Sequence, residues 1–305
     1  MNDICGVIFL DKPLGWTSRK AVNEITRIFS VAGQKRIKAG HTGTLDPLAT
    51  GMLPILLGDA TRFAEMGLDA VKSYRVTFDL SYQTDTLDKE GETVRICSET
   101  VGQQQLEQVL ENFRGDIEQV PPIYSAIRID GKRAHDMARK GETVEMKSRP
   151  VTIYDLKLVS FDFPLVTLEV ICSKGTYIRS LARDIGETLG LGGCVTQLRR
   201  LSTAGWPEAM MVTPEVLSEQ KMNCLLPLGQ WLRDFERVEL QDDDIKRFLQ
   251  GQRIQLRNTA ADADEKVVAV FSGTTVLGTG QLKAGLRHLV LHPVRILPSA
   301  QKRYL

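Results

Sequence analysis

The order in which strand-like and helix-like segments follow one another is the feature that most restricts the fold of this chain. Residues 6–13, GVIFLDKP, form an apolar run typical of a buried strand and stopped by a proline. Apolar residues at helical spacing follow at 18–29, and an alternating, strand-like segment follows at 73–84. A helix-like segment at 100–115 precedes a strand at 165–175 and a helix at 176–190. Because strands and helices do not alternate strictly, we expect an α+β fold with a mixed, mainly antiparallel central sheet flanked by helices.

Capping signals place the ends of the expected helices. Thr17 or Ser18 can accept a hydrogen bond from the free backbone amides at the start of the helix at 18–29. Gly115 is expected to close the second helix, because glycine readily takes the left-handed conformation found after helix ends. Thr176 is expected to cap the third, which carries Arg179 and Arg183 four residues apart on one face.

The character of the chain changes near residue 235. Short strand-like runs separated by glycines dominate the remainder, at 266–273, 275–282 and 286–297. We therefore expect two domains, at 1–234 and 235–305, the second being a small β-rich module. The first contains a long basic and polar stretch at about 123–149, and a loop of this length is unusual in a compact domain unless it has a function.

Composition narrows the classes of protein that the chain can belong to. The five cysteines of the 305 residues are scattered without zinc-site spacing, and their odd number argues against a disulfide framework. The pattern favours a reducing compartment, the cytoplasm. No apolar run approaches the roughly 20 residues of a membrane-spanning helix. The net charge of +1 indicates no general affinity for nucleic acid, so basic clusters indicate a nucleic-acid footprint only where they converge on one groove.

Asp46 is the acid with the most unusual surroundings. Within residues 39–63, AGHTGTLDPLATGMLPILLGDATRF, two glycines before Asp46 permit positive φ, and Pro47 favours an extended aspartate. The side chain is thus presented from a rigid loop. Three interpretations remain open: a turn aspartate bonded to its own backbone, a metal ligand beside His41, or an ionised nucleophile or base.

Three further side chains are candidates for the same site. Arg179 directly follows a strand and is a candidate cation for that aspartate, or it pairs with Asp184 or Glu187 on its own helix. Tyr74 lies on an expected strand, where it either stacks on a planar base or fills the core. His41 is a candidate ligand, catalyst or stacking group, although a lone histidine is more often satisfied by ordinary hydrogen bonds. The residues alone leave the function open.

The segment at 39–63 resembles the signature of the TruB family, bacterial synthases that make pseudouridine at position 55 of tRNA. The resemblance covers essentially residues 4–232, with a weaker match to a PUA-type RNA-binding module beyond. Several other family-like segments occur in the same order: LDKPLGWTS, KSYRVTF, QTDTLDKEG, FRGDIEQVPPIYSAIRIDGKRAHDMARKGE, CSKGTYIRSLARDIG and QLRRL.

The resemblance implies a pseudouridine synthase fold and an isomerase that needs no cofactor and no metal. Asp46 would be the catalytic aspartate, attacking either the uracil ring or the anomeric carbon of the ribose. Arg179 would keep it ionised and oriented, and Tyr74 would stack on the target base and be a candidate for proton transfer. Two further residues, Tyr177 and Leu198, would line the base pocket. His41 would insert into the RNA stack while the base is flipped out.

The resemblance also implies the partner, the T-arm stem-loop of tRNA. The basic stretch at about 123–149 corresponds to a thumb that folds over this arm, and the chain would act as a monomer without a guide RNA or a membrane. A tRNA-binding or tRNA-folding chaperone remains the alternative, in which catalysis is secondary. The expected RNA contacts are Arg62, Arg128, Lys132, Arg133, Arg139, Lys174 and Arg199, with Arg287, Arg295 or Lys302 in the C-terminal module.

Overall fold

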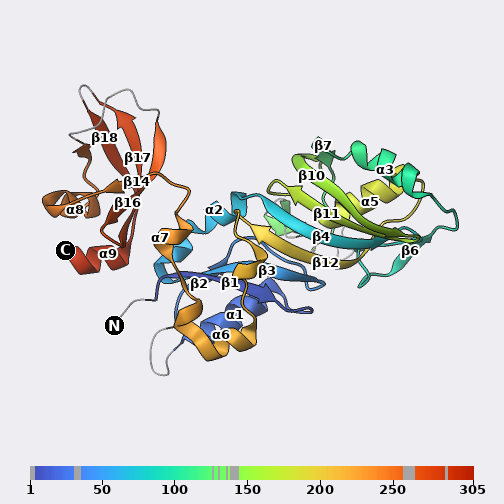
Figure 1. The fold of residues 1–305 in the computed structure, drawn as a ribbon, viewed down its shortest axis with the longest axis horizontal. Helices are drawn as coiled ribbons and strands as arrows, with labels where there is room; N and C mark the ends of the chain where they lie inside the picture. Colours follow the sequence, from blue (N-terminus) through green and yellow to red (C-terminus); the bar gives the residue numbers. More distant parts are fainter. Residues whose placement is uncertain are drawn as a thin grey trace.

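The computed structural model describes residues 4–30, 36–125, 127–129, 131–134, 137, 144–256, 265–285 and 288–305. In the described part of the chain, two large sheets form two units, a long body and a smaller C-terminal unit at its end (Figure 1). The prediction of an α+β fold with a mainly antiparallel central sheet and a β-rich C-terminal part is confirmed.

Nine strands make up the central sheet within the described residues, in the order β13-β1-β3-β12-β4-β11-β10-β7, with β2 on the side of β3. Neighbouring strands run antiparallel except for β12 and β3, which are parallel. The strands are β1 Gly6–Lys12, β2 Ala39–His41, β3 Ala49–Leu57, β4 Lys72–Asp79, β7 Gly115–Gln119, β10 Arg149–Asp162, β11 Leu165–Cys172, β12 Cys194–Thr203 and β13 Leu226–Pro227.

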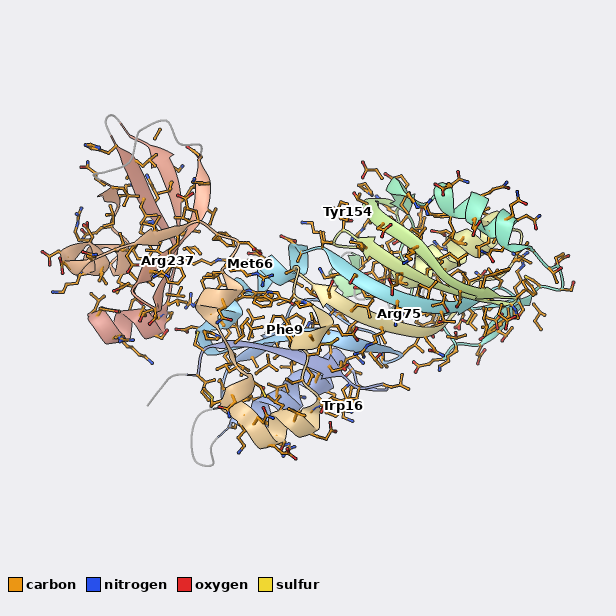
Figure 2. The ribbon with its side chains drawn as sticks, in the orientation of Figure 1. Phe9, Trp16, Met66, Arg75, Tyr154 and Arg237 are labelled. Carbon is orange, nitrogen blue, oxygen red and sulfur yellow. The ribbon has the colours of Figure 1, made fainter. Side chains whose placement is uncertain are left out.

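Helices cover one face of this sheet. In β4, Tyr74, Val76 and Phe78 alternate toward a core that continues into the helices, while Arg75 lies on the open face and pairs with Glu169 (Figure 2). The alternation matches a half-buried antiparallel sheet. The covering helices are α1 Ser18–Phe29, α3 Gln103–Glu111, α5 Ile178–Thr188 and α6 Pro214–Gln220.

The capping predictions have mixed outcomes. Thr17 caps α1, since its side chain accepts from the amide of Lys20. The other two are wrong. Helix α3 ends at Glu111, and Gly115, with φ of 81°, instead begins β7. The hydroxyl of Thr176 donates to a carbonyl of its own loop, and α5 begins one residue later than a Thr176 cap would place it, without a side-chain cap.

Shorter elements connect the body. A 3₁₀ helix, η1, and the helix α2 follow β3, and two small antiparallel ladders lie outside the central sheet. One of these ladders, β8 with β9, lies within the basic stretch at 123–149. These elements are η1 Gly58–Phe63, α2 Ala64–Asp69, β5 Tyr82–Thr84, β6 Thr93–Ile96, β8 Arg128–Ile129, β9 Lys132–Arg133, η2 Glu208–Met210, η3 Lys221–Cys224 and α7 Leu228–Trp231.

The C-terminal unit shares a core with the body. Phe9 of β1 packs against Trp206 and Trp231, with ring centroids 5.0 and 6.0 Å apart, and this cluster continues into the second sheet (Figure 2). Arg295 adds an ion pair to Glu65 across the junction. The elements of this unit are β14 Arg237–Glu239, α8 Asp242–Leu249, β15 Ile254–Leu256, β16 Lys266–Ser272, β17 Thr275–Ala284, β18 Leu289–Ile296 and α9 Pro298–Tyr304.

Candidate active site

The loop between β2 and β3 carries Asp46, and α1 holds this loop in place. The hydroxyl of Ser18 accepts from the amide of Leu45 at 2.9 Å and donates to the carbonyl of the same residue at 3.0 Å. On the other side of the aspartate, the carbonyl of Pro47 accepts from the amide of Gly15 at 2.8 Å. The backbone is therefore fixed on both sides of Asp46, which agrees with the rigid loop expected from the sequence.

An ion pair joins Asp46 to Arg179 at the start of α5. Arg179 Nη2 lies 2.9 Å from Asp46 Oδ2. Asp184, the alternative partner on the helix, pairs instead with Arg183. Within the described residues, the Asp46 carboxylate makes no hydrogen bond to the backbone of its own turn. Of the three interpretations left open for Asp46, this geometry favours the third, a nucleophile or base.

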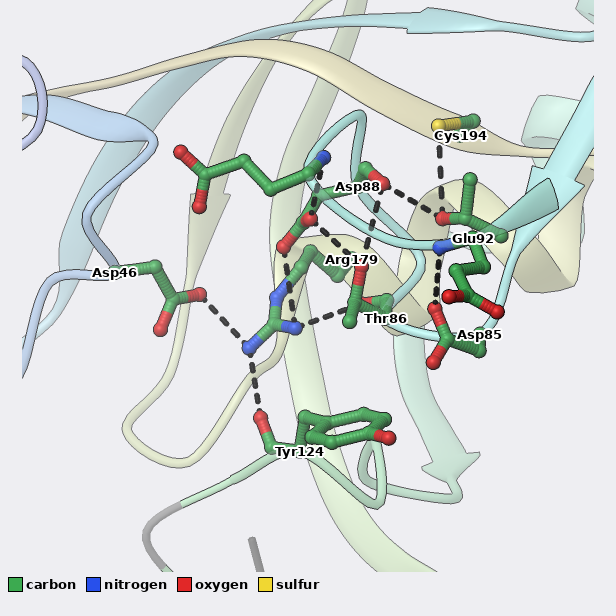
Figure 3. A network of polar contacts seen from close by, with 10 residues as sticks. Asp46, Asp85, Thr86, Asp88, Glu92, Tyr124, Arg179 and Cys194 are labelled. Carbon is green, nitrogen blue, oxygen red and sulfur yellow. Dashed lines mark hydrogen bonds and ion pairs between the residues drawn. The ribbon is translucent and has the colours of Figure 1, made fainter. Parts of the chain in front are cut away.

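Arg179 is itself held by a buried network (Figure 3). Its side chain is 6% exposed and its Nη1 lies 3.4 Å from Asp88 Oδ2. Nη1 also donates to the carbonyl of Thr86 at 2.7 Å, and Nη2 donates to the carbonyl of Tyr124 at 3.0 Å. A guanidinium is planar and a fork of donors, so these contacts fix its orientation as well as its charge. The guanidinium that pairs with the Asp46 carboxylate is therefore held in one orientation.

Asp88 was missed as a site residue by reasoning from the sequence. It lies in the turn between β5 and β6, where Leu87 has a positive φ of 63°. Its Oδ1 accepts from the hydroxyl of Thr86 at 2.7 Å and from the amide of Glu90 at 3.1 Å. The signal was present in QTDTLDKEG, where hydroxyl and acidic residues crowd one turn, but nothing local points to an arginine about 90 positions further on.

A cavity of about 320 Å³ adjoins the ion pair, and Tyr74, Tyr177 and Leu198 all line it. Tyr74 comes from β4 and Leu198 from the neighbouring β12, on the buried face of the sheet. The amide of Tyr177 donates to the side chain of the buried Gln119 at 2.8 Å, which fixes the loop before α5. The structure thus brings the five residues Asp46, Tyr74, Tyr177, Arg179 and Leu198 together around one cavity.

Burial controls the ionisation of the groups that line this cavity. Burial raises the pKa of Tyr74, and the neighbouring Arg200 cation acts in the opposite direction. The pKa of Tyr177 is also raised by burial. Burial lowers the pKa of Lys72, at the cavity wall, to about 8, and the repulsion of Arg200 adds to that shift. Both tyrosines are therefore neutral hydrogen-bonding groups at neutral pH.

His41 lies in the wall of a second, larger cavity of about 780 Å³, and not in the smaller one. Asp46 and Arg179 line both cavities, so their ion pair stands between the two. Burial lowers the pKa of His41, and the cations of Arg200 and Arg19 lower it further. A neutral imidazole beside the loop that carries Asp46 is suited to stacking on a base.

The expected RNA contacts fall into three groups. Arg199 is engaged by Asp11, at 2.8 and 2.9 Å, and by Glu208 at 2.8 Å, which raises its pKa. Lys174 is exposed and paired with Asp69, and Arg62 lies in the last turn of η1 with its carbonyl bonded to Arg295. For Arg128, Lys132 and Arg133 only the backbone is described, and Arg139 and Arg287 lie outside the described residues. Their contacts with RNA stay predictions.

Across the described ranges, no group of three histidine, cysteine, aspartate or glutamate side chains is placed to hold a metal ion. None of the helices in the described part of the chain is long and apolar enough to cross a membrane.

Solved structures with the same fold exist. One is a chain in the structure of an H/ACA RNP bound to a substrate RNA containing 2′-deoxyuridine, with a TM-score of 0.70 and 23% identity over 96% of this chain and 84% of that one. Another is a chain of a Cbf5-Nop10-Gar1 complex, with a TM-score of 0.70 and 24% identity over 95% of this chain and 84% of that one. At these identities the likeness concerns the fold.

Family models match nearly the whole chain. Residues 27–178 match the N-terminal domain of the TruB family pseudouridylate synthases, and residues 179–235 match the C-terminal domain of tRNA pseudouridylate synthase B. Residues 237–297 match the C-terminal region of pseudouridine synthase II TruB. Fold, site and matches together define a pseudouridine synthase, an enzyme of the isomerase class.

Similar proteins from bacteria narrow the class to one family. The tRNA pseudouridine synthase B of Actinobacillus pleuropneumoniae is 45% identical over 84% of this chain and 85% of its own length. That of Pasteurella multocida is 42% identical over 97% of this chain and 96% of its own length. The chain belongs to the TruB family, as its resemblance to that family predicted.

Proposed function

We propose that this chain isomerises uridine to pseudouridine in tRNA, at position 55 of the T-loop, with Asp46 as the catalytic carboxylate. The observation that carries the proposal is the ion pair between Asp46 and the buried Arg179, placed between two cavities. The smaller cavity has a volume suited to one base and walls of Tyr74, Tyr177 and Leu198. The tRNA substrate is inferred from the names of the similar proteins.

The proposed roles follow from where each side chain lies. Asp46 attacks the ring or the sugar of the target nucleotide, while Arg179 pairs with the carboxylate and keeps it oriented. Tyr74 stacks on the uracil in the smaller cavity. The base must leave its stack before the glycosidic bond can break, at a cost of a few kcal/mol. Stacking on His41, in the larger cavity, offsets part of this cost.

The rest of the chain would hold the RNA. We propose the catalytic domain at 1–234 with its thumb at about 123–149, and an RNA-binding module of the PUA type at 235–305. The enzyme would act on the T-arm alone, as a cytoplasmic monomer without a guide RNA, cofactor or metal. The names of the bacterial relatives mention tRNA and no guide RNA.

The test uses purified protein and an unmodified tRNA transcript, with Asp46→Asn as the comparison. The RNA is digested, its nucleosides are separated and the modified position is mapped. Pseudouridine at T-loop position 55, formed by the wild-type protein only, supports both the reaction and the role of Asp46. Release of free uracil would instead show a hydrolase, and modification only with an added guide RNA would show a guided enzyme.

A tRNA-folding chaperone is the alternative. The larger cavity, with His41 in its wall, would serve base displacement whether or not chemistry follows. Tight tRNA binding with no pseudouridine from the wild-type protein would favour the chaperone. Because Asp46→Asn removes the carboxylate and keeps the shape of the side chain, it should abolish isomerisation while tRNA binding persists.

A further inference from the structure

Arg200 is a buried cation in the wall of the smaller cavity, and the roles proposed above leave it unused. Its side chain is 1% exposed. Within the described residues, no carboxylate lies at ion-pairing distance from it. Burial of a charge without such a partner destabilises the folded protein. The position of Arg200 therefore suggests a role in the site.

Two hydrogen bonds hold the Arg200 guanidinium. Nε donates to the carbonyl of Met52 at 2.6 Å, and Nη2 donates to the carbonyl of Gly43 at 3.3 Å. Its charge also acts on the neighbouring Tyr74, where it opposes the rise in the pKa of the phenol. Met52 belongs to β3 and Gly43 to the loop that carries Asp46, so the guanidinium is fixed between the central sheet and the catalytic loop.

Strand register places Arg200 beside Tyr74. The two residues lie directly opposite each other on the antiparallel strands β12 and β4, with both side chains on the buried face. Such cross-strand neighbours are about 5 Å apart at Cβ. On its other side Arg200 lies opposite Gly51 of β3, where a side chain would meet the Arg200 backbone at 2.2 Å. The sheet therefore leaves the arginine little freedom to move.

Chemistry fixes the direction of any hydrogen bond between Arg200 and Tyr74. A guanidinium has only donors, so the phenol oxygen must accept from Arg200. The phenol hydrogen is then free to turn away from the arginine, and Tyr74 lines the cavity proposed to receive the base. Such a bond would give the hydroxyl a preferred orientation before any substrate binds.

We propose that Arg200 is a positioning residue that acts through Tyr74, holding the phenol oxygen as an acceptor and directing its hydrogen into the cavity. This inference rests on the proposed function, since it takes the smaller cavity as the site of the base. It assigns no chemical step to Arg200 itself. The arginine orders a group that contacts the substrate, and electrostatic preorganisation of this kind is a large part of what enzyme sites contribute.

The first test uses NMR to detect the effect of Arg200 on Tyr74, without measuring activity. The protein is labelled with ¹³C at the ζ carbon of tyrosine, and the Tyr74 signal is identified by its loss in Tyr74→Phe. Arg200→Met should shift this signal. Arg75→Met is the matched control, because Arg75 is adjacent to Tyr74 on β4 but pairs with Glu169 on the open face, and the signal should not move. An unchanged signal in Arg200→Met would overturn the proposal.

The second test is a double-mutant cycle on single-turnover rates with tRNA. Arg200→Met should slow the wild-type reaction by about 100-fold, the scale of a misplaced catalytic group, with tRNA affinity unchanged. In the Tyr74→Phe background the same substitution should change the rate by less than about threefold. An equal loss in both backgrounds would mean that Arg200 acts through the fold and not through Tyr74.

Variants that do not fold, and a wild-type protein without activity, are interpreted separately. If Arg200→Met does not fold, Arg200→Lys takes its place, since it keeps the charge and loses the fork, and it should show the same dependence on Tyr74. If neither folds, the residue is structural and the inference is overturned. If wild-type protein forms no pseudouridine, the proposed function fails, while the tyrosine signal still decides whether Arg200 orders Tyr74.

Discussion

Removing Arg179 should damage stability and activity by separate routes. In Arg179→Met, the Asp46 side chain, 36% exposed, can be hydrated, whereas that of Asp88, 8% exposed, stays buried without its cation. A buried charge that has lost its ion-pair partner destabilises a protein by about 3–5 kcal/mol. Asp88 keeps bonds from a hydroxyl and an amide, which favours the lower end of the range. We therefore expect a loss of about 3 kcal/mol, or on the order of 10 °C in melting temperature.

A second substitution separates the two routes. In Arg179→Met with Asp88→Asn, the buried carboxylate is replaced by a neutral amide of the same shape, so most of the lost stability should return. Activity should not return, because Asp46 still lacks its partner. Urea and thermal denaturation followed by circular dichroism measure the stability of the wild-type, single and double variants, and pseudouridine formation measures the activity.

The reasoning would be refuted by a double variant no more stable than Arg179→Met. That result would mean that the stability loss comes from the two backbone carbonyls, or from packing, and not from Asp88. A double variant with restored activity would refute the claim that activity depends on the pairing of Arg179 with Asp46.

Three further predictions follow from individual residues. His41→Ala should weaken binding of the T-arm by about 5- to 150-fold if its ring stacks on a base, as a filter-binding assay would show. Gly51→Ala, where a methyl group would meet the backbone of Arg200 at a φ of 96°, should destabilise the fold by more than about 2 kcal/mol. The control Gly15→Ala, also at positive φ but in open space, should lose about 1 kcal/mol in the same urea titration. Burial lowers the pKa of Lys12 to about 8 from its ordinary 10.5, so the folded state releases this proton first. The stability of the wild type relative to Lys12→Met should therefore rise from pH 8 to pH 10.5, and equal values in urea titrations at pH 7.5 and 10 would contradict the shift.

Local patterns predicted the parts of this fold that local physics controls. The Thr17 cap, the strand at the N-terminus and the glycine-separated strands of the C-terminal unit were all evident, because capping and period-two alternation act within a few residues. The partnership of Asp46 with Arg179 was reached as one of several options, since a charge presented from a rigid loop needs a counter-charge.

The remainder depends on pairing between distant segments. Strand β3 lies between β1 and β12 and is buried, so its sequence shows an apolar run with glycine and proline and no alternation. Strand β12 places Arg199 on one face and Arg200 on the other, yet the sequence shows only two adjacent arginines. Which of them pairs with acids and which faces the cavity is decided by its register with β4, across more than a hundred residues.

The core that Phe9, Trp206 and Trp231 share with the C-terminal sheet has a consequence for how the protein unfolds. Two units that share apolar side chains cannot lose structure independently, because opening either one exposes the aromatic surface of the other to water. Calorimetry should therefore record a single cooperative transition, with calorimetric and van't Hoff enthalpies in agreement. The C-terminal sheet therefore completes one of the two hydrophobic cores of the described chain and should not move independently of the body.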